Sequence, residues 1–253
     1  MSGVLAGKAA VVTGGGTGIG AAIARLFADE GARVAVAGRR REPLERVAAD
    51  IGGIAVPTDV ADEDGVRALF ARCERAFGRL DVLVNNAGDP GSTVAIEDQD
   101  METWDRTFAV NTRGVILCIK HALPQLKRTR GAIVNVTSDS VHRPKALRSA
   151  YAGSKMAVLG ITQSVAHEVG RAGVRVNALA PGATQSEMLI RVFAERARSQ
   201  GIPEATVYAR SAGTKALRRL SAPDEVARAV LFLASDAAAA ITGELVTVDC
   251  GQT

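Results

Sequence analysis

Tyr151 and Lys155 lie four positions apart in the run Tyr-Ala-Gly-Ser-Lys, which opens a helical pattern. This spacing places a phenol and an ammonium group on the same face of a helix. A free tyrosine has a pKa of about 10, too high for a base near neutral pH. A neighbouring ammonium group stabilises the phenolate and lowers that pKa. The pair therefore predicts an acid–base group, with Ser149 expected as the N-cap of its helix.

Ser138 is a third candidate for the same chemistry because it directly follows a predicted strand, residues 132–137. Parallel strands end at one edge of a sheet, so this serine would reach the cleft that Tyr151 faces. Its hydroxyl could then hydrogen-bond a substrate oxygen and orient it. Each of these residue types, taken singly, is more often found on an ordinary surface, so the prediction depends on their coming together.

A glycine-rich run, Thr13-Gly-Gly-Gly-Thr-Gly-Ile-Gly20, joins the first predicted strand to the first predicted helix. Glycines let the chain turn sharply and bring its backbone close to a pyrophosphate. The N-terminus of the helix offers unpaired N–H groups and a partial positive charge to the phosphates. The position of the run therefore predicts a dinucleotide site. The residues expected to contact the dinucleotide here are Gly14, Gly16, Thr17, Gly18, Ile19 and Gly20.

The cofactor preference depends on the residues after the second predicted strand. A carboxylate there would bind the ribose 2′-OH of NAD(H), but this chain has Gly38 followed by Arg39 and Arg40. A guanidinium group can hold a 2′-phosphate, so Arg39 favours NADP(H), with NAD(H) as the alternative. Solvated loop arginines are the other interpretation. Asp59 and Val60, after the third predicted strand, are expected to contact the adenine.

These residues need a scaffold, and the chain alternates short β-branched apolar runs with helical patterns. Nearly continuous apolar runs are typical of parallel strands that helices cover on both faces. The pattern predicts an α/β fold, a single-domain Rossmann-type doubly wound parallel sheet over residues 1–253. The predicted strands are residues 9–13, 33–37, 53–58, 82–85, 132–137, 175–179 and 245–248. Predicted helices include residues 19–30, 63–77, 101–126, 151–169 and 223–234.

One segment, residues 183–221, interrupts this alternation with a long helical stretch rich in Arg, Ser and Gly. It follows a strand whose carboxyl end is expected at the ligand-binding edge of the sheet. We therefore predict that it forms a helical lid over the substrate pocket.

Composition argues against several other classes of protein. The 253 residues carry a net charge of +4, but the arginines are scattered and no nucleic-acid module is recognisable. Three separated cysteines form no Cys-x-x-Cys pair, and three histidines lack metal-ligand spacing, so we expect no metal. No apolar stretch is long enough for a membrane helix, and the first strand starts too early to leave room for a signal peptide. A cytoplasmic protein is expected.

Together these motifs resemble those of the short-chain dehydrogenase/reductase family. The resemblance covers nearly all 253 residues, and its separate motifs occur in the family's order. The matching motifs are Thr13-Gly-Gly-Gly-Thr-Gly-Ile-Gly20, Asp59-Val60, Asn85-Asn86-Ala87-Gly88, Asn111, Ser138, Tyr151-x-x-x-Lys155 and Pro181-Gly182.

The resemblance implies a role for each matching residue. The implied catalytic tetrad is Asn111, Ser138, Tyr151 and Lys155: Tyr151 exchanges the proton, Ser138 holds the carbonyl, Lys155 binds the nicotinamide ribose, and Asn111 holds a water. Further implied cofactor contacts come from Asn86, Ala87, Gly88, Pro181, Gly182 and Thr184. The helices that carry Asn111 and Tyr151 are implied to join subunits into dimers or tetramers.

The chain departs from the usual family pattern at several positions outside the tetrad. Thr17 stands where many NADP-preferring relatives have a basic residue, so only Arg39 supports NADP(H). Thr184 and Ser186 replace an aliphatic residue and a threonine after Pro181-Gly182. Asp89-Pro90 follows the Asn-Asn-Ala-Gly run, and Cys250 replaces a common glycine.

The resulting functional prediction is an oxidoreductase that transfers a hydride between a nicotinamide and a ketone or secondary alcohol. An NADPH-dependent reductase of 3-oxoacyl-type or small ketones is favoured over an NAD-dependent alcohol dehydrogenase. A non-catalytic cofactor-binding module is the alternative from another class, although such proteins usually lose part of the tetrad. A sugar-nucleotide epimerase would need a larger C-terminal domain. The loop basic residues His142, Arg143, Lys145 and Arg148 either attract an anionic substrate or are simply solvated.

Overall fold

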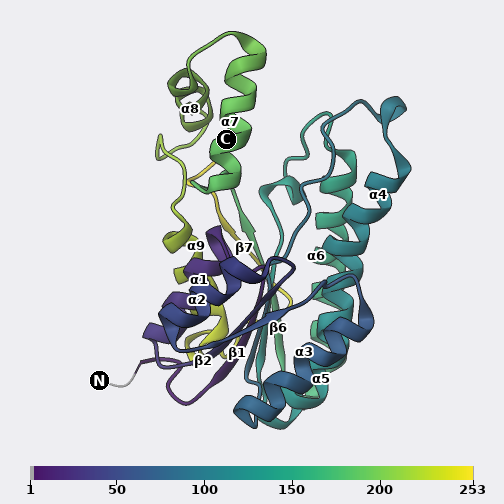
Figure 1. Cartoon of the computed structure of the whole chain (residues 1–253), viewed down its shortest axis with the longest axis vertical. Helices are drawn as coiled ribbons and strands as arrows, with labels where there is room; N and C mark the ends of the chain where they lie inside the picture. The colour runs from purple at the N-terminus through teal and green to yellow at the C-terminus, as the bar shows by residue number, and fades with distance from the viewer. Residues whose placement is uncertain (1–2, 253) are drawn as a thin grey trace.

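A computed structural model describes residues 3–252, apart from six side chains of helix α7 (Glu187, Met188, Arg191, Glu195, Arg196 and Ser199). In this part of the chain seven strands form one parallel sheet in the order β3-β2-β1-β4-β5-β6-β7 (Figure 1). The strands are β1 (Ala9–Thr13), β2 (Arg33–Gly38), β3 (Ile54–Pro57), β4 (Val82–Asn85), β5 (Ala132–Val136), β6 (Arg175–Pro181) and β7 (Leu245–Val248).

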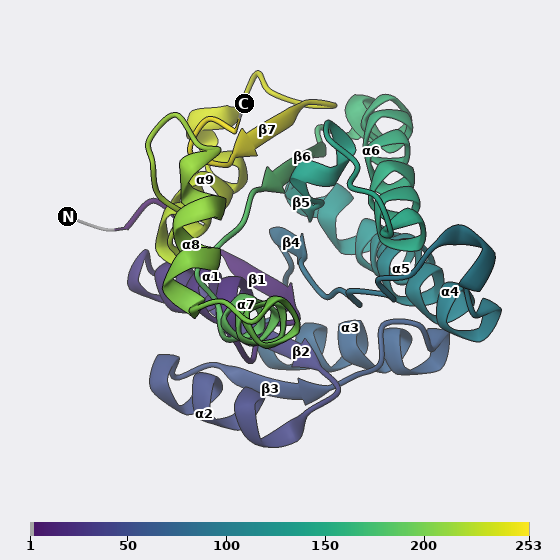
Figure 2. The ribbon, with the colours of Figure 1, turned by 90° about the horizontal axis from the view of Figure 1, so that it is seen from above.

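Helices cover both faces of this sheet (Figure 2). One face carries α1 (Gly18–Asp29), α2 (Arg41–Ile51) and α9 (Pro223–Ala234). The other carries α3 (Glu63–Phe77), α5 (Gly114–Thr129) and α6 (Ser149–Val169), and α4 (Met101–Phe108) leads into α5. The remaining helices, α7 (Glu187–Gln200) and α8 (Glu204–Gly213), stand beyond the end of the sheet (Figure 1).

Strand β1 shows why the apolar runs are continuous. All five of its residues are buried, with Ala10 and Val12 packed among the side chains of α1, α2 and α9. Val11 points to the opposite face and packs among α3, α5 and α6. Successive side chains of β1 alternate between two covered faces, so its apolar run is continuous from Ala9 to Val12. The doubly wound α/β fold expected from the sequence is confirmed.

Two expected helices differ in detail from the sequence prediction. The pattern at residues 101–126 predicts one helix, whereas the chain forms α4, a π-helical turn at Ala109–Arg113, and α5 as far as Thr129. The apolar period cannot reveal one extra residue in a turn, and such π-bulges are frequent at functional sites. The expectation that Ser149 caps α6 is wrong: Arg148 occupies the N-cap position, and Ser149 is the first helical residue.

The sheet order changes direction between β1 and β4, which lie side by side in the centre. At this switch point the connections leave the sheet towards opposite faces, and the loops at the carboxyl ends of the two strands diverge around a crevice. The glycine run follows β1 and the Asn86–Gly88 run follows β4, so the fold brings two of the predicted motifs to that crevice.

The segment predicted as a lid begins and ends at one point. Thr184 and Ser221 form an isolated parallel bridge, and their hydroxyl oxygens lie 3.0 Å apart. Between them, α7 and α8 enclose a small hydrophobic cluster of their own that includes Phe193 and Val207. The predicted helical segment is therefore a compact projection whose first and last residues lie side by side.

Within the part of the chain that the structure describes, no helix combines the length and the apolar character that crossing a membrane requires. The described side chains include no group of three or more His, Cys, Asp or Glu placed to hold a metal ion. Cys73 and Cys118 are buried thiols and Cys250 is partly exposed; none of the three is in a disulfide.

Candidate active site

Ser138 and Tyr151 meet at the carboxyl end of β5. Ser138 is the N-cap of a short 3-10 turn, where its Oγ accepts a hydrogen bond from the Ser140 backbone N–H and donates to Oδ1 of Asp139 at 3.1 Å. Tyr151 comes from the first turn of α6, and its phenol lies near enough to the Ser138 side chain for the serine to act on the phenol pKa. The structure therefore brings the predicted serine and tyrosine close together.

Burial dominates the ionisation of Tyr151. Removal from water raises the pKa of its phenol, while the nearby Ser138 side chain and the positive charge of Arg148 lower the pKa. The net direction is upward because burial outweighs these two effects. Nζ of Lys155 lies 6.0 Å from the centre of the Tyr151 ring. The lowered pKa expected from the Tyr–Lys pair stays a prediction for the enzyme with its cofactor bound.

Lys155 is buried, with 4% of its surface exposed, one helical turn beyond Tyr151. Its Nζ donates a hydrogen bond of 3.0 Å to the backbone oxygen of Val136, the last residue of β5. Burial lowers the pKa of this ammonium group to about 8. The lysine is thus held at the sheet edge and is still mostly protonated at neutral pH.

Asn111 lies in the π-helical turn between α4 and α5 and is fully buried. Its Oδ1 accepts a hydrogen bond from the Asp89 backbone N–H, and its Nδ2 donates to the Asp89 carbonyl and to Oγ of Ser154. A Cβ atom on Gly88 would lie 3.5 Å from Asn111 Oδ1 and 3.6 Å from Lys155 Nζ. The fourth member of the expected tetrad therefore shares one neighbourhood with Lys155.

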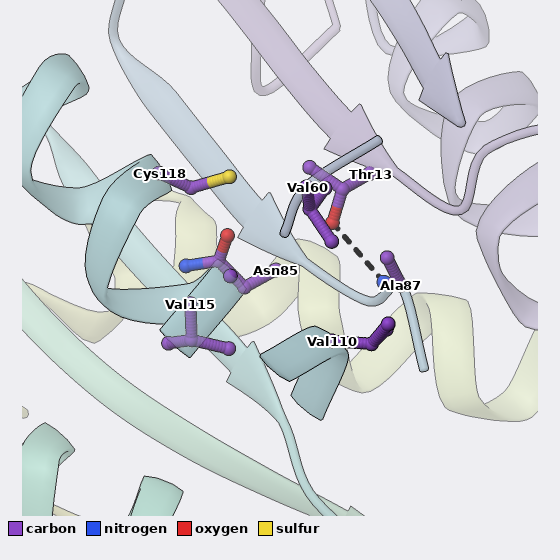
Figure 3. A pocket seen from close by; sticks show the side chains of 8 residues that line it. Thr13, Val60, Asn85, Ala87, Val110, Val115 and Cys118 are labelled. Carbon is purple, nitrogen blue, oxygen red and sulfur yellow. Dashed lines mark hydrogen bonds between the residues drawn. The ribbon is translucent and has the colours of Figure 1, made fainter. Parts of the chain in front are cut away.

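The loop after β4 supports the glycine run. Nδ2 of Asn86 donates hydrogen bonds to the carbonyls of Thr13 and Gly14, and the Thr13 hydroxyl accepts from the backbone N–H groups of Asn86 and Ala87. Figure 3 shows the packed floor beneath, where the Thr13 hydroxyl points to Ala87. The pocket drawn there retains no free volume for a ligand, so it belongs to the core and not to the binding site.

The glycine run fits a dinucleotide. Gly14 has φ +64°, a left-handed conformation, and a Cβ atom there would lie 2.8 Å from Nδ2 of Asn86. A Cβ atom on Gly20 would lie 2.1 Å from the Gly14 carbonyl oxygen. The N-cap of α1, Thr17, makes no side-chain capping bond, so the first N–H groups of this helix are not capped by it. A bare backbone and an uncapped helix N-terminus suit a pyrophosphate. Gly16, Gly18 and Ile19 complete this turn.

The residues predicted to contact the adenosine half follow β2 and β3, on the other side of β1 from the tetrad. Arg39 is exposed, and the neighbouring Arg40 donates a hydrogen bond of 3.2 Å to the Thr17 hydroxyl. The Asp59 carboxylate accepts from the Ala61 backbone N–H, and Val60 is buried. The two arginines therefore stand beside the glycine run, with Arg40 bonded to it.

Pro181 and Gly182 lie at the carboxyl end of β6, where the Gly182 N–H donates to the carbonyl of Val248. Thr184 follows, and its side chain is buried. Its hydroxyl donates a hydrogen bond of 3.1 Å to the Gly182 carbonyl and lies 3.0 Å from the Ser221 hydroxyl. The residues predicted for the nicotinamide side of the site therefore lie where the projecting α7–α8 segment leaves the sheet.

Two charged residues near the tetrad were not identified by the sequence analysis as part of it. Asp139 is buried directly after Ser138, and among residues 3–252 its Oδ2 has no hydrogen-bond partner. Arg148 places its guanidinium carbon 4.6 Å from the centre of the Tyr151 ring. The position of Asp139, directly after the serine at the end of a predicted strand, was a usable sequence signal. No sequence pattern signals the contact between Arg148 and Tyr151.

Comparison with known proteins places this arrangement in context. Residues 14–253 match a family model described as enoyl-(acyl carrier protein) reductase. The chain is similar to the short chain dehydrogenase/reductase astE of Aspergillus oryzae, at 38% identity over 98% of this chain and 95% of that one. It is 40% identical to cis-4-hydroxycyclohexanecarboxylate dehydrogenase of Sinomonas cyclohexanicum, over 100% of this chain and 99% of the relative. The crystal structure of levodione reductase superimposes with a TM-score of 0.91 at 30% identity, covering 97% of each chain.

Proposed function

The chain belongs to the short-chain dehydrogenase/reductase family, and from that premise we propose that it moves a hydride between a nicotinamide cofactor and a ketone or secondary alcohol at the Ser138–Tyr151 site. The observation that carries the proposal is the meeting of Ser138, Tyr151, Lys155 and Asn111 beside a glycine run that fits a dinucleotide.

In this proposal each side chain has a defined task. When bound, a nicotinamide cofactor would supply or take up the hydride. Tyr151 gives a proton to the substrate oxygen during reduction and takes it back during oxidation. Ser138 holds that oxygen by a hydrogen bond. Lys155, fixed by the Val136 carbonyl, supplies positive charge near the phenol, and Asn111 holds the loop at Asp89 in place.

We propose NADP(H) as the preferred cofactor and NAD(H) as the alternative. Gly14, Gly16, Thr17 and the N-terminus of α1 would hold the pyrophosphate, and Arg39 the 2′-phosphate. Asn86, Ala87 and Gly88 would hold the ribose next to the nicotinamide, with Pro181, Gly182 and Thr184 at the carboxamide. The exposed, unpaired state of Arg39 among the described residues favours this assignment.

For the substrate, we favour a ring-borne secondary alcohol or its ketone. The support is the similarity over the whole chain to a dehydrogenase of cis-4-hydroxycyclohexanecarboxylate. A 3-oxoacyl substrate is the alternative. We further propose that residues 183–221 act as the substrate lid, because the two ends of this projection meet at Thr184 and Ser221, and its helices α7 and α8 stand beyond the end of the sheet.

We also propose a homo-oligomer, a tetramer or dimer, formed through α5 and α6. A groove of about 440 Å³ lies between these helices, and Ile116 in it is 46% exposed. Its lining is mostly apolar: Ile116, Ile119, Leu123, Pro124, Ile161 and Val165, with Lys120, Lys127 and Glu168 at its margin. Exposed apolar surface of this kind is typical of protein contacts. Light scattering that gives the mass of a single chain would overturn this proposal.

A cytoplasmic location completes the proposal, since buried and unpaired cysteines suit a reducing compartment.

The experiment that tests the proposed function is a fluorescence titration of the protein with NADPH and NADH, followed by turnover of cyclic alcohols and ketones. Tighter binding of NADPH and cofactor-dependent turnover are expected. Preference for NADH would overturn the cofactor assignment and favour an NAD-dependent alcohol dehydrogenase. Failure to bind either nucleotide would remove the basis for hydride transfer.

A further inference from the structure

Four basic residues occupy the loop between β5 and α6, and the structure separates them by their contacts. Nε2 of His142 lies 3.3 Å from Oγ1 of Thr247, and the Arg143 guanidinium lies 3.6 Å from the Asp249 carboxylate. Lys145 is exposed. Only Arg148 contacts the proposed acid–base group, with its guanidinium carbon 4.6 Å from the Tyr151 ring centre.

Arg148 is held in this place by its surroundings. Its Nη1 donates a hydrogen bond of 3.3 Å to the Thr93 hydroxyl, and the Val94 N–H donates to the Leu147 carbonyl at 3.1 Å. Leu147 has φ +66°, a left-handed conformation that a leucine adopts only when neighbouring contacts enforce it. The left-handed backbone of Leu147 fixes the position of the next residue, so these contacts hold Arg148 beside Tyr151.

The charge of Arg148 is not neutralised by a neighbouring carboxylate. Among the side chains that the structure describes, no Asp or Glu forms an ion pair with it, whereas Arg143 on the same loop is paired with Asp249. A guanidinium group carries five N–H donors in a planar fork that matches the two oxygens of a carboxylate. Within the described part of the chain, the bond to Thr93 is the one hydrogen bond of this fork, and the guanidinium carbon stands 4.6 Å from the Tyr151 ring centre.

We propose that Arg148 binds a carboxylate group of the substrate, so that the enzyme selects secondary alcohols and ketones that carry one. A carboxylate fits better than a phosphate because Arg148 is the only cation in contact with Tyr151 from this loop, and one guanidinium fork matches the two oxygens of a carboxylate. This inference rests on the proposed hydride-transfer function and adds the substrate class to it.

The test compares cis-4-hydroxycyclohexanecarboxylate with its uncharged methyl ester. In the wild type we expect kcat/KM for the acid to exceed that for the ester by at least about tenfold, since charge-assisted hydrogen bonds have this strength. Arg148→Gln should abolish the preference mainly by raising KM for the acid, and Arg148→Lys should keep part of it. Arg143→Gln is the matched control, with the same change on the same loop, and should retain the preference.

A ratio between the two substrates separates binding of the carboxylate from any general effect of Arg148 on Tyr151. Absence of a preference in the wild type, or a preference that persists in Arg148→Gln, would overturn the proposal. Calorimetry with cyclohexanecarboxylate and the cofactor-loaded protein gives an independent readout: affinity should fall at least about tenfold in Arg148→Gln. If neither alcohol is oxidised, the proposed function fails, while calorimetry still decides whether Arg148 binds a carboxylate.

Discussion

Asn111 and Asp89 exchange a pair of hydrogen bonds: the Asp89 N–H donates to Asn111 Oδ1 at 2.7 Å, and Asn111 Nδ2 donates to the Asp89 carbonyl at 2.9 Å. This pairing fixes the loop after β4 to the π-helical turn that interrupts the α4–α5 helix. The same Nδ2 donates to Oγ of Ser154, next to Lys155. One amide therefore holds three segments of the site together.

Replacing Asn111 should weaken both folding and activity. Asn111→Ala leaves the Asp89 N–H and carbonyl without their partner in a buried position, at a cost of about 1–3 kcal/mol for each group that stays unsatisfied. For a chain of this size the melting temperature should fall by roughly 5 °C or more. Calorimetry and turnover measure the two effects. An unchanged melting temperature would show that the paired bonds do not hold the loop.

Gly20→Ala should abolish cofactor binding. The added methyl group would lie 2.1 Å from the Gly14 carbonyl oxygen and 2.5 Å from Asn86 Nδ2, so the turn that would hold the pyrophosphate must move. Gly170→Ala is the matched control, because a Cβ atom there meets nothing within 4 Å and the φ of −55° suits alanine. Fluorescence titration with NADPH should show binding in the control alone. Equal affinities would refute the assignment of the glycine run.

Arg39→Ala should weaken the binding of NADPH and leave the binding of NADH little affected. Loss of a charge-assisted contact to the 2′-phosphate removes about 1.5–3 kcal/mol, roughly a tenfold to hundredfold change in the dissociation constant. Arg41→Ala is the control, because Arg41 is exposed on α2 and paired with Glu45. The dissociation constants of both nucleotides measure this effect. An equal loss of NADH affinity would mean that Arg39 does not bind the 2′-phosphate.

Lys155 should make stability depend on pH in a defined direction. Burial lowers its pKa from 10.5 to about 8, so between these values the unfolded chain binds more protons and stability rises with pH. Below about pH 8 the buried ammonium group exerts its full destabilising effect. The unfolding free energy of the wild type relative to Lys155→Met should therefore increase from about pH 7 to about pH 10, by up to about 3 kcal/mol.

Urea unfolding of both proteins at several pH values measures this difference. The lost hydrogen bond to the Val136 carbonyl adds an offset that does not vary with pH, so only the slope is diagnostic. A difference that is flat, or that falls with pH, would contradict the lowered pKa of Lys155.

The strands and the order of the motifs were predictable because each depends on local patterns. Apolar runs such as Ala9–Thr13 identify strands, α3 and α9 have the predicted bounds, and the glycine run marks the first strand–helix turn. Strand order follows once every crossover is right-handed and the family resemblance is accepted. The position of the projecting segment, residues 183–221, was also predictable, since its composition differs from the rest.

Features that depend on tertiary contacts were not predictable. The π-helical turn at Asn111 arises from bonds to Asp89 and Ser154, which no helical period encodes. The N-cap of α6 shifts by one residue to Arg148, a residue type with no capping preference. The upward pKa of Tyr151 results from burial outweighing charges that sequence spacing suggested were close.

The Tyr151 hydroxyl is the group on which the proposed proton transfer depends most directly. We therefore measure hydride transfer to or from a cyclic alcohol–ketone pair by wild type and Tyr151→Phe, with Tyr208→Phe as the control for the other tyrosine of the chain. General acid–base catalysis predicts that Tyr151→Phe loses about 10²–10⁴-fold in kcat, with NADPH affinity retained. A Tyr151→Phe enzyme that keeps wild-type kcat would contradict the proposed acid–base site.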